Sequence, residues 1–178
     1  MAIDPERIFT TAQLFHESDF VLSTHATQRK DYPFFISSAV NGALALELYL
    51  KCLILIDTGK AIQNTHNYWI LFQKLKRETQ TEIKDWYARL PPSLIEIASQ
   101  HDPGLKEQNK EFTLEAELKR SQDAFVMWRY VYELGSHSGE TTTSASGRVR
   151  DSVIQVIRAR QPNWPLRPSC VPRTSPAL

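Results

Sequence analysis

The chain has 178 residues, of which 42% are hydrophobic and 23% charged, the composition of one ordinary globular domain. Its two cysteines, Cys52 and Cys170, belong to no CxxC motif or Cys/His cluster, which excludes a structural zinc site and a disulfide framework. The net charge of +1 is unevenly spread, because residues 148–178 hold six arginines and one acid, whereas residues 1–147 hold 15 basic and 19 acidic side chains. A basic C-terminal end suggests an anionic partner such as RNA, although a solvated tail explains it equally well.

Neither the N-terminus nor the longest apolar segment has the pattern of a membrane sequence. Charged residues among the first seven positions interrupt any apolar signal-peptide region. Residues 34–56 form the longest hydrophobic stretch, and Glu47 and Lys51 lie near its middle, where two charges oppose a membrane span. We therefore predict that this stretch is the buried core helix of a cytoplasmic protein.

The first two helices are predicted from their start and stop signals. Asp4 followed by Pro5 is a typical N-cap and first helical residue, so the first helix begins there. Residues 31–33, Asp-Tyr-Pro, break the chain, because the residue before a proline disfavours helix. The second helix is predicted over about 34–57, with Gly59 as its stop. It is apolar on nearly all sides, so we expect other helices to enclose it.

Shorter helices are expected after this central one. Thr65 is predicted to cap a third helix, and residues 79–82, Thr-Gln-Thr-Glu, form a capping box for a fourth. Ser93 restarts a short helix after a Pro-Pro interruption, and residues 101–112 are expected to form a polar loop.

Two further helices complete the body of the chain. A long helix is expected from Thr113 to Gly135, with a core stripe formed by Leu114, Leu118, Phe125, Trp128 and Tyr132. The last helix is predicted over about 148–160. We therefore predict an all-α fold, an antiparallel bundle of five to six helices over residues 1–160. Residues 161–178 hold five of the ten prolines, so we predict a Pro/Arg-rich flexible tail that is dispensable for folding.

Most familiar catalytic motifs are absent from the sequence: it contains no Gly-rich phosphate loop, no GxSxG and no HExxH. What remains is a set of polar residues within apolar helices. Glu47 and Lys51 are four residues apart, which predicts either an ordinary helical ion pair or a pair that lines a polar cleft or subunit seam. His66, directly after Thr65, either fixes the turn between helices or serves as a functional imidazole near the same cleft.

A second set of candidates lies near the end of the long helix. Arg129 either forms a structural pair with Glu133 or binds phosphate through two parallel hydrogen bonds. Tyr130 lies beside it. His137 follows beyond Gly135 and is either a solvated loop residue or a group that folds back toward Arg129.

Parts of the chain resemble the HEPN family. The run ALALELYLKCL from Ala43 to Leu53, the turn at Gly59 and the Thr-His-Asn start at 65–67 are similar to the second and third helices of that family. The similarity is close over about residues 39–75, and the WRYVYE run at 128–133 also resembles some HEPN subfamilies. Catalytic HEPN members carry an Arg, four to six residues, then a His, whereas seven residues separate Arg129 from His137 here.

The resemblance implies a small helical bundle, usually a homodimer, that engages RNA or a nucleotide. Many members are metal-independent ribonucleases of toxin–antitoxin or anti-phage defence systems, so an antitoxin is one expected partner. Arg129 would then stabilise charge on the phosphoryl oxygens, and His137 or His66 would move the proton. The remaining cleft residues would orient the site: Glu47, Lys51, Tyr130 and Glu133.

A non-catalytic alternative has the same fold. Other HEPN members are partners of nucleotidyltransferases, so the chain is alternatively an interaction module whose polar residues serve packing. In both cases we expect no metal and no cofactor, because the sequence holds no cluster of metal-ligand residues.

Overall fold

The computed structural model of the protein describes residues 3–30, 32–102, 104, 111–130 and 147–171. Within these residues all regular structure is helical and no strand is present, so the predicted all-α fold is confirmed. The elements are α1 (Pro5–Arg29), α2 (Tyr32–Thr58), α3 (Tyr68–Gln73), α4 (Arg77–Arg89), α5 (Leu94–Ser99), α7 (Leu114–Arg120), α8 (Ala124–Arg129), α9 (Gly147–Arg160) and the 3₁₀ turn η3 (Pro168–Cys170).

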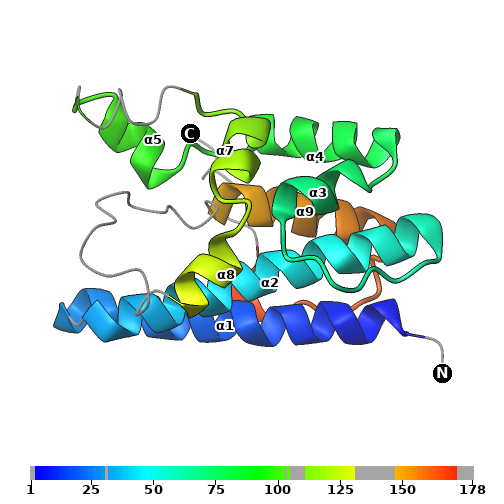
Figure 1. Cartoon of the computed structure of the whole chain (residues 1–178), viewed down its shortest axis with the longest axis horizontal. Helices are drawn as coiled ribbons and strands as arrows, with labels where there is room; N and C mark the ends of the chain where they lie inside the picture. Colours follow the sequence, from blue (N-terminus) through cyan, green and yellow to red (C-terminus); the bar gives the residue numbers. More distant parts are fainter. Residues whose placement is uncertain (1–2, 31, 103, 105–110, 131–146, 172–178) are drawn as a thin grey trace.

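The helices are stacked in layers (Figure 1). The two long helices α1 and α2 lie side by side and antiparallel along the length of the molecule. Helix α9 packs between α2 and α4, and the short helix α8 lies across α2. Because α2 contacts α1, α3, α8 and α9, it is the central element of the bundle.

Local signals set the ends of α1 and α2. The Asp4 side chain accepts a hydrogen bond of 3.0 Å from the backbone N–H of Glu6, and Pro5 is the first helical residue. Lys30 ends α1 in the left-handed region, at φ 54°, and Gly59 follows α2 at φ 68°. Glycine adopts that conformation without steric cost. The predicted second helix is confirmed, and it begins two residues earlier than expected.

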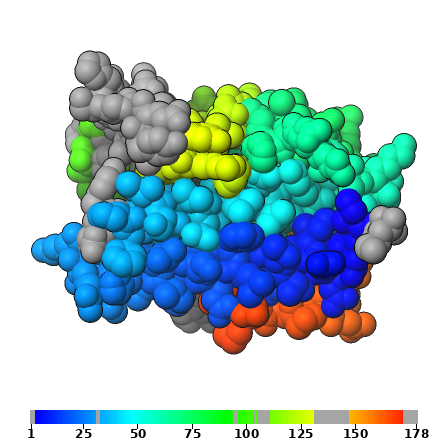
Figure 2. Space-filling view, turned by 60° about the horizontal axis from the view of Figure 1, so that its bottom comes forward, coloured from blue at the N-terminus to red at the C-terminus, as the bar shows by residue number. Residues whose placement is uncertain are grey.

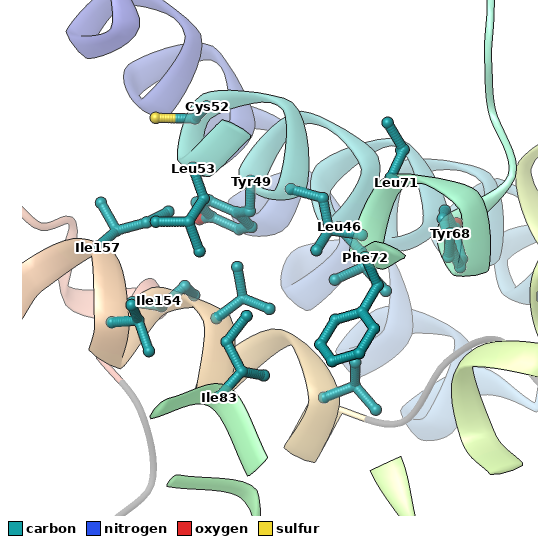
Figure 3. Close-up of a cluster of buried hydrophobic side chains, with 14 of the residues drawn as sticks. Leu46, Tyr49, Cys52, Leu53, Tyr68, Leu71, Phe72, Ile83, Ile154 and Ile157 are labelled. Atoms are coloured by element: carbon teal, nitrogen blue, oxygen red, sulfur yellow. The ribbon is translucent and has the colours of Figure 1, made fainter. Parts of the chain in front are cut away.

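The core forms where α3, α4 and α9 close over α2 (Figure 3). The side chains drawn there come from all four helices, and each is at most 1% exposed: Leu46, Tyr49 and Leu53 of α2, Leu71 and Phe72 of α3, Ile83 of α4, and Ile154 and Ile157 of α9. Among the described helices, α2 is the one that is long and apolar enough to cross a membrane by length and composition. In this fold 56% of the apolar 18-residue window that meets this criterion is buried inside the bundle, and the core helix of a globular protein meets the same criterion.

The predicted starts of the third and fourth helices are wrong. Asn67, not Thr65, caps α3, and its side chain accepts a hydrogen bond of 2.9 Å from the N–H of Ile70. Thr79 lies inside α4 rather than at its start, and its hydroxyl donates to the Asp57 carboxylate at 3.0 Å. For Thr79, a hydrogen bond to the buried Asp57 of α2 therefore replaces the capping interaction expected at the start of α4.

The long helix predicted from Thr113 to Gly135 is also wrong, because the chain breaks after α7. The carbonyl of Gln122 accepts a hydrogen bond of 2.9 Å from the N–H of Tyr68, the first residue of α3. Ser121 and Asp123 leave helical geometry on either side of it, and α8 restarts at Ala124. The break thus supplies a backbone partner to the start of α3. Residues 131–135 of the predicted helix, most of the loop at 101–112, and Tyr132 of the core stripe lie outside the described residues.

The flexible tail predicted at 161–178 is wrong for residues 161–171, which lie along α1 as the orange-red atoms of Figure 2. Trp164 and Leu166 pack against the core, and the rings of Trp164 and Phe9 are 5.5 Å apart. The buried amide of Gln13 donates to the carbonyl of Pro165 and accepts from the N–H of Arg167, at 3.0 and 2.7 Å. These contacts anchor a segment whose proline content suggested disorder. Residues 172–178 lie outside the described residues.

A buried histidine beneath this segment makes stability depend on pH. His16 is 5% exposed, and the Tyr49 hydroxyl lies 3.4 Å from its Nδ1. Burial, and then the positive charge of Arg150, lower the pKa of His16 from 6.5 to about 3. The folded chain therefore keeps His16 neutral, and between these two pH values the unfolded chain binds one proton more.

We expect the wild-type chain to lose stability as the pH falls from about 6.5 toward 3, by about 1.4 kcal/mol per pH unit relative to His16→Gln. The free energy of unfolding in urea, measured for both chains between about pH 7 and pH 5, gives a difference of about 2 kcal/mol in their pH dependence. Parallel curves for the two chains would contradict the assignment, whatever the absolute stability of the variant.

Candidate functional site

The predicted pair of Glu47 and Lys51 lies at the centre of a polar cluster on α2. Glu47 is 2% exposed, and its Oε1 accepts a hydrogen bond of 2.7 Å from Lys51 Nζ. Its Oε2 lies 2.9 Å from Nδ1 of His66. Both carboxylate oxygens are thus engaged, as a buried charge requires.

His66 is held in place by the segment that leads into α3. Its neighbour Asn67 caps α3 and donates a hydrogen bond of 3.0 Å to Asp123, at the break before α8. The ring of Phe125 lies 5.1 Å from the imidazole, centroid to centroid. The His66 side chain nevertheless stays 47% exposed. The imidazole is therefore held at Nδ1 and contacted on one side by the Phe125 ring, while Nε2 has no hydrogen-bond partner among the described residues.

The negative charge of Glu47 also acts on Tyr68, the first residue of α3. Tyr68 is fully buried, and its hydroxyl donates a hydrogen bond of 2.8 Å to the carbonyl of Ala43. Burial, and then the negative charge of Glu47, raise the pKa of Tyr68. The phenol therefore remains a neutral donor, and it ties the His66 segment to the middle of α2.

Arg129 and Tyr130 lie at the C-terminal end of α8. Both are exposed, and the Arg129 guanidinium is 5.4 Å from the centre of the Tyr130 ring. Arg129 has no ion pair with any acid in the described part of the chain. Since Phe125 and Arg129 are four residues apart on α8, they face the same side of that helix. Phe125 contacts His66, so Arg129 lies one turn farther along the same side.

The structure thus brings together three of the predicted site residues, Glu47, Lys51 and His66, here named the His66 cluster, with Arg129 one helical turn beyond the aromatic contact. His137 and Glu133 lie outside the described residues. Two contacts of the site were not predictable from the sequence: the ring contact of Phe125 with His66 and the hydrogen bond from Asn67 to Asp123. The spacing places Phe125 in the predicted core stripe, and nothing local to it indicates a histidine 59 positions away.

No group of three or more His, Cys, Asp or Glu side chains that could hold a metal ion occurs within the residues the structure describes. Comparison with protein-family models, with curated proteins and with solved structures finds no match to this chain. The resemblance to the HEPN family stays a prediction. The function proposed below is inferred from the contacts among Glu47, Lys51 and His66.

An imidazole bonded at Nδ1 to a buried carboxylate is suited to proton transfer. When the neutral ring donates its Nδ1–H to Glu47, the lone pair of Nε2 is the site that can accept a proton. Glu47 fixes the tautomer and the ring orientation, as a carboxylate does beside a catalytic histidine. Lys51, by holding the other oxygen of Glu47, keeps that carboxylate in place.

Proposed function

We propose that the chain binds RNA at the His66 cluster and cleaves it as a metal-independent endoribonuclease. The observation that carries the proposal is the 2.9 Å contact of the half-exposed His66 with Glu47, which is itself almost fully buried. A histidine that only fixed a turn would need no buried carboxylate, and removing that charge from water is costly.

In the proposed reaction the RNA supplies its own nucleophile. Nε2 of His66 takes the proton of a 2′-hydroxyl, whose oxygen attacks the adjacent phosphorus. The bond from phosphorus to the 5′-oxygen breaks, and that oxygen takes a proton from solvent. The products are a 2′,3′-cyclic phosphate and a 5′-hydroxyl end. The Arg129 guanidinium stabilises the negative charge that develops on the phosphoryl oxygens.

We expect His66→Ala and Arg129→Ala each to lower the rate of RNA cleavage by at least roughly 100-fold while the fold is retained. The assay incubates purified full-length chain with RNA in the presence of EDTA, and it measures the cyclic phosphate ends. Arg129→Lys should restore little activity, since an ammonium cannot form two parallel bonds to phosphate.

The chain offers a matched control for each variant. His101 is exposed and lies outside the cluster. Arg89, like Arg129, is an exposed arginine that ends a helix beside an aromatic ring, here Trp86 at 5.2 Å. His101→Ala and Arg89→Ala should cleave like the wild type. Equal cleavage by wild type and His66→Ala would refute the assignment, and absence of cleavage by wild type on several RNAs would favour the interaction module.

A further inference from the structure

A cavity of about 310 Å³ opens between α1, α2, α8 and the start of α9, and none of Glu47, Lys51 and His66 lines it. One part of its wall is apolar and includes Phe35, Ala39 and Leu46. The polar part is formed by Asp19, Ser38 and Arg150, together with the indole of Trp128. Its volume lies at the lower end of the range for small-molecule sites, so it suits a compact ligand.

The polar side of the cavity is held in a defined arrangement. Asp19 accepts hydrogen bonds from Arg150 Nη1 at 2.7 Å and from the Ser38 hydroxyl at 2.5 Å. Gly42 makes room for this carboxylate, because a Cβ there would lie 2.9 Å from Asp19 Oδ2. Asp19 thereby fixes the guanidinium by one nitrogen and leaves the other two nitrogens of Arg150 without a hydrogen-bond partner among the described residues.

Two buried donors at this cavity lack acceptors within the described chain: Nε of Arg150 and Nε1 of Trp128. A buried donor left without a partner costs about 1–3 kcal/mol, so native structures rarely retain two at one cavity without a use. Both groups are N–H donors, which means that a ligand recovers this cost only by presenting acceptor atoms. A carboxylate offers two acceptor oxygens, one for each of these donors.

We propose that this cavity binds a small monocarboxylate with an apolar body. The carboxylate oxygens accept from Arg150 Nε and Trp128 Nε1, and the apolar body packs against Phe35, Ala39 and Leu46. The Asp19 carboxylate, bonded to the same guanidinium, repels a second full negative charge. The cavity therefore favours a monoanion over a phosphate dianion. The proposal is independent of RNA cleavage at His66.

The test titrates the full-length chain, without RNA, with benzoate, indole-3-acetate and hexanoate. Calorimetry gives the affinity, and the indole N–H resonance of Trp128, assigned with Trp128→Phe, reports contact at the cavity. We expect at least one of these acids to bind and to move that resonance. Arg150→Gln should weaken binding at least about tenfold, whereas Arg158→Gln, a change at an exposed arginine on the same helix, should not.

Because Arg150→Gln also removes the partner of Asp19, a second variant keeps the test decisive. Ala39→Leu fills the cavity from its apolar wall, leaves the ion pair intact, and should abolish binding. The proposal is overturned if none of the three acids binds, or if neither variant weakens binding. Equal binding of benzyl alcohol or of inorganic phosphate would overturn it as well, since the first lacks the carboxylate and the second lacks the apolar body.

Discussion

A chain that ends at Gln161 is expected to melt at least about 10 °C below the full-length chain. The deletion removes Trp164 and Leu166 from the core and takes away the two hydrogen bonds that the Gln13 side chain makes with Pro165 and Arg167. It also removes the fully buried Cys170. Lost burial and two lost hydrogen bonds together cost on the order of 5 kcal/mol. Thermal unfolding followed by circular dichroism measures the shift.

A chain that ends at Val171 is the matched control, because it keeps every contact of residues 162–171 described above. The difference between the two truncations therefore measures what this segment contributes. Within the full-length chain, Trp164→Ala should cost about 2 kcal/mol and the exposed Asn163→Ala less than about 0.5 kcal/mol. If the two truncated chains melted at the same temperature, the segment would not stabilise the fold.

The parts of the fold that were predictable from sequence are those set by neighbouring residues. The Asp-Pro start of α1 and the glycine after α2 act within one turn of the helix that each delimits. These helix ends could therefore be predicted from neighbouring residues alone. The burial of α2 was predictable because it is apolar on nearly all sides, which leaves no face for solvent.

Three of the errors have a common physical cause, since each depends on a partner far away in the chain, whereas the start of α3 was misplaced because of the local cap from Asn67 to Ile70. The break after α7 allows the Gln122 carbonyl to accept a hydrogen bond from the N–H of Tyr68. Thr79 does not cap α4, because its hydroxyl donates to Asp57 instead. Residues 161–171 dock because Gln13, about 150 positions earlier, offers both a donor and an acceptor. Propensity and spacing describe local preference, and such tertiary hydrogen bonds override it.

The candidate site shows the same division. The spacing of Glu47 and Lys51 predicted their ion pair, because residues four apart share a helix face. The contact of Glu47 with His66 joins two elements across a turn, and the sequence left two roles for this histidine open. The Asp19–Arg150 pair spans 131 positions and gave no local signal at all. The functional roles of all these residues stay predictions that the proposed variants test.

Asp57→Ala is expected to destabilise the fold by about 3–5 kcal/mol, because it removes the centre of a buried network at the C-terminal end of α2. The Asp57 side chain is 2% exposed and accepts hydrogen bonds from the backbone N–H of Lys76, from Thr79 and from Arg160. These partners belong to the start of α4 and the end of α9. Without the carboxylate, the Arg160 guanidinium loses its most buried partner where the three helices meet.

Glu82 provides the control, since it is the other acid paired with Arg160 but is 46% exposed. Glu82→Ala should cost less than about 1 kcal/mol, as expected for a solvent-exposed ion pair. Urea unfolding of both variants gives the two free energies. Combining Asp57→Ala with Arg160→Met should cost less than the sum of the single changes, because the double variant leaves no buried charge unpaired. Equal losses for Asp57→Ala and Glu82→Ala would mean that burial of Asp57 adds nothing to the pair, and additive losses in the double variant would mean that the two residues act separately.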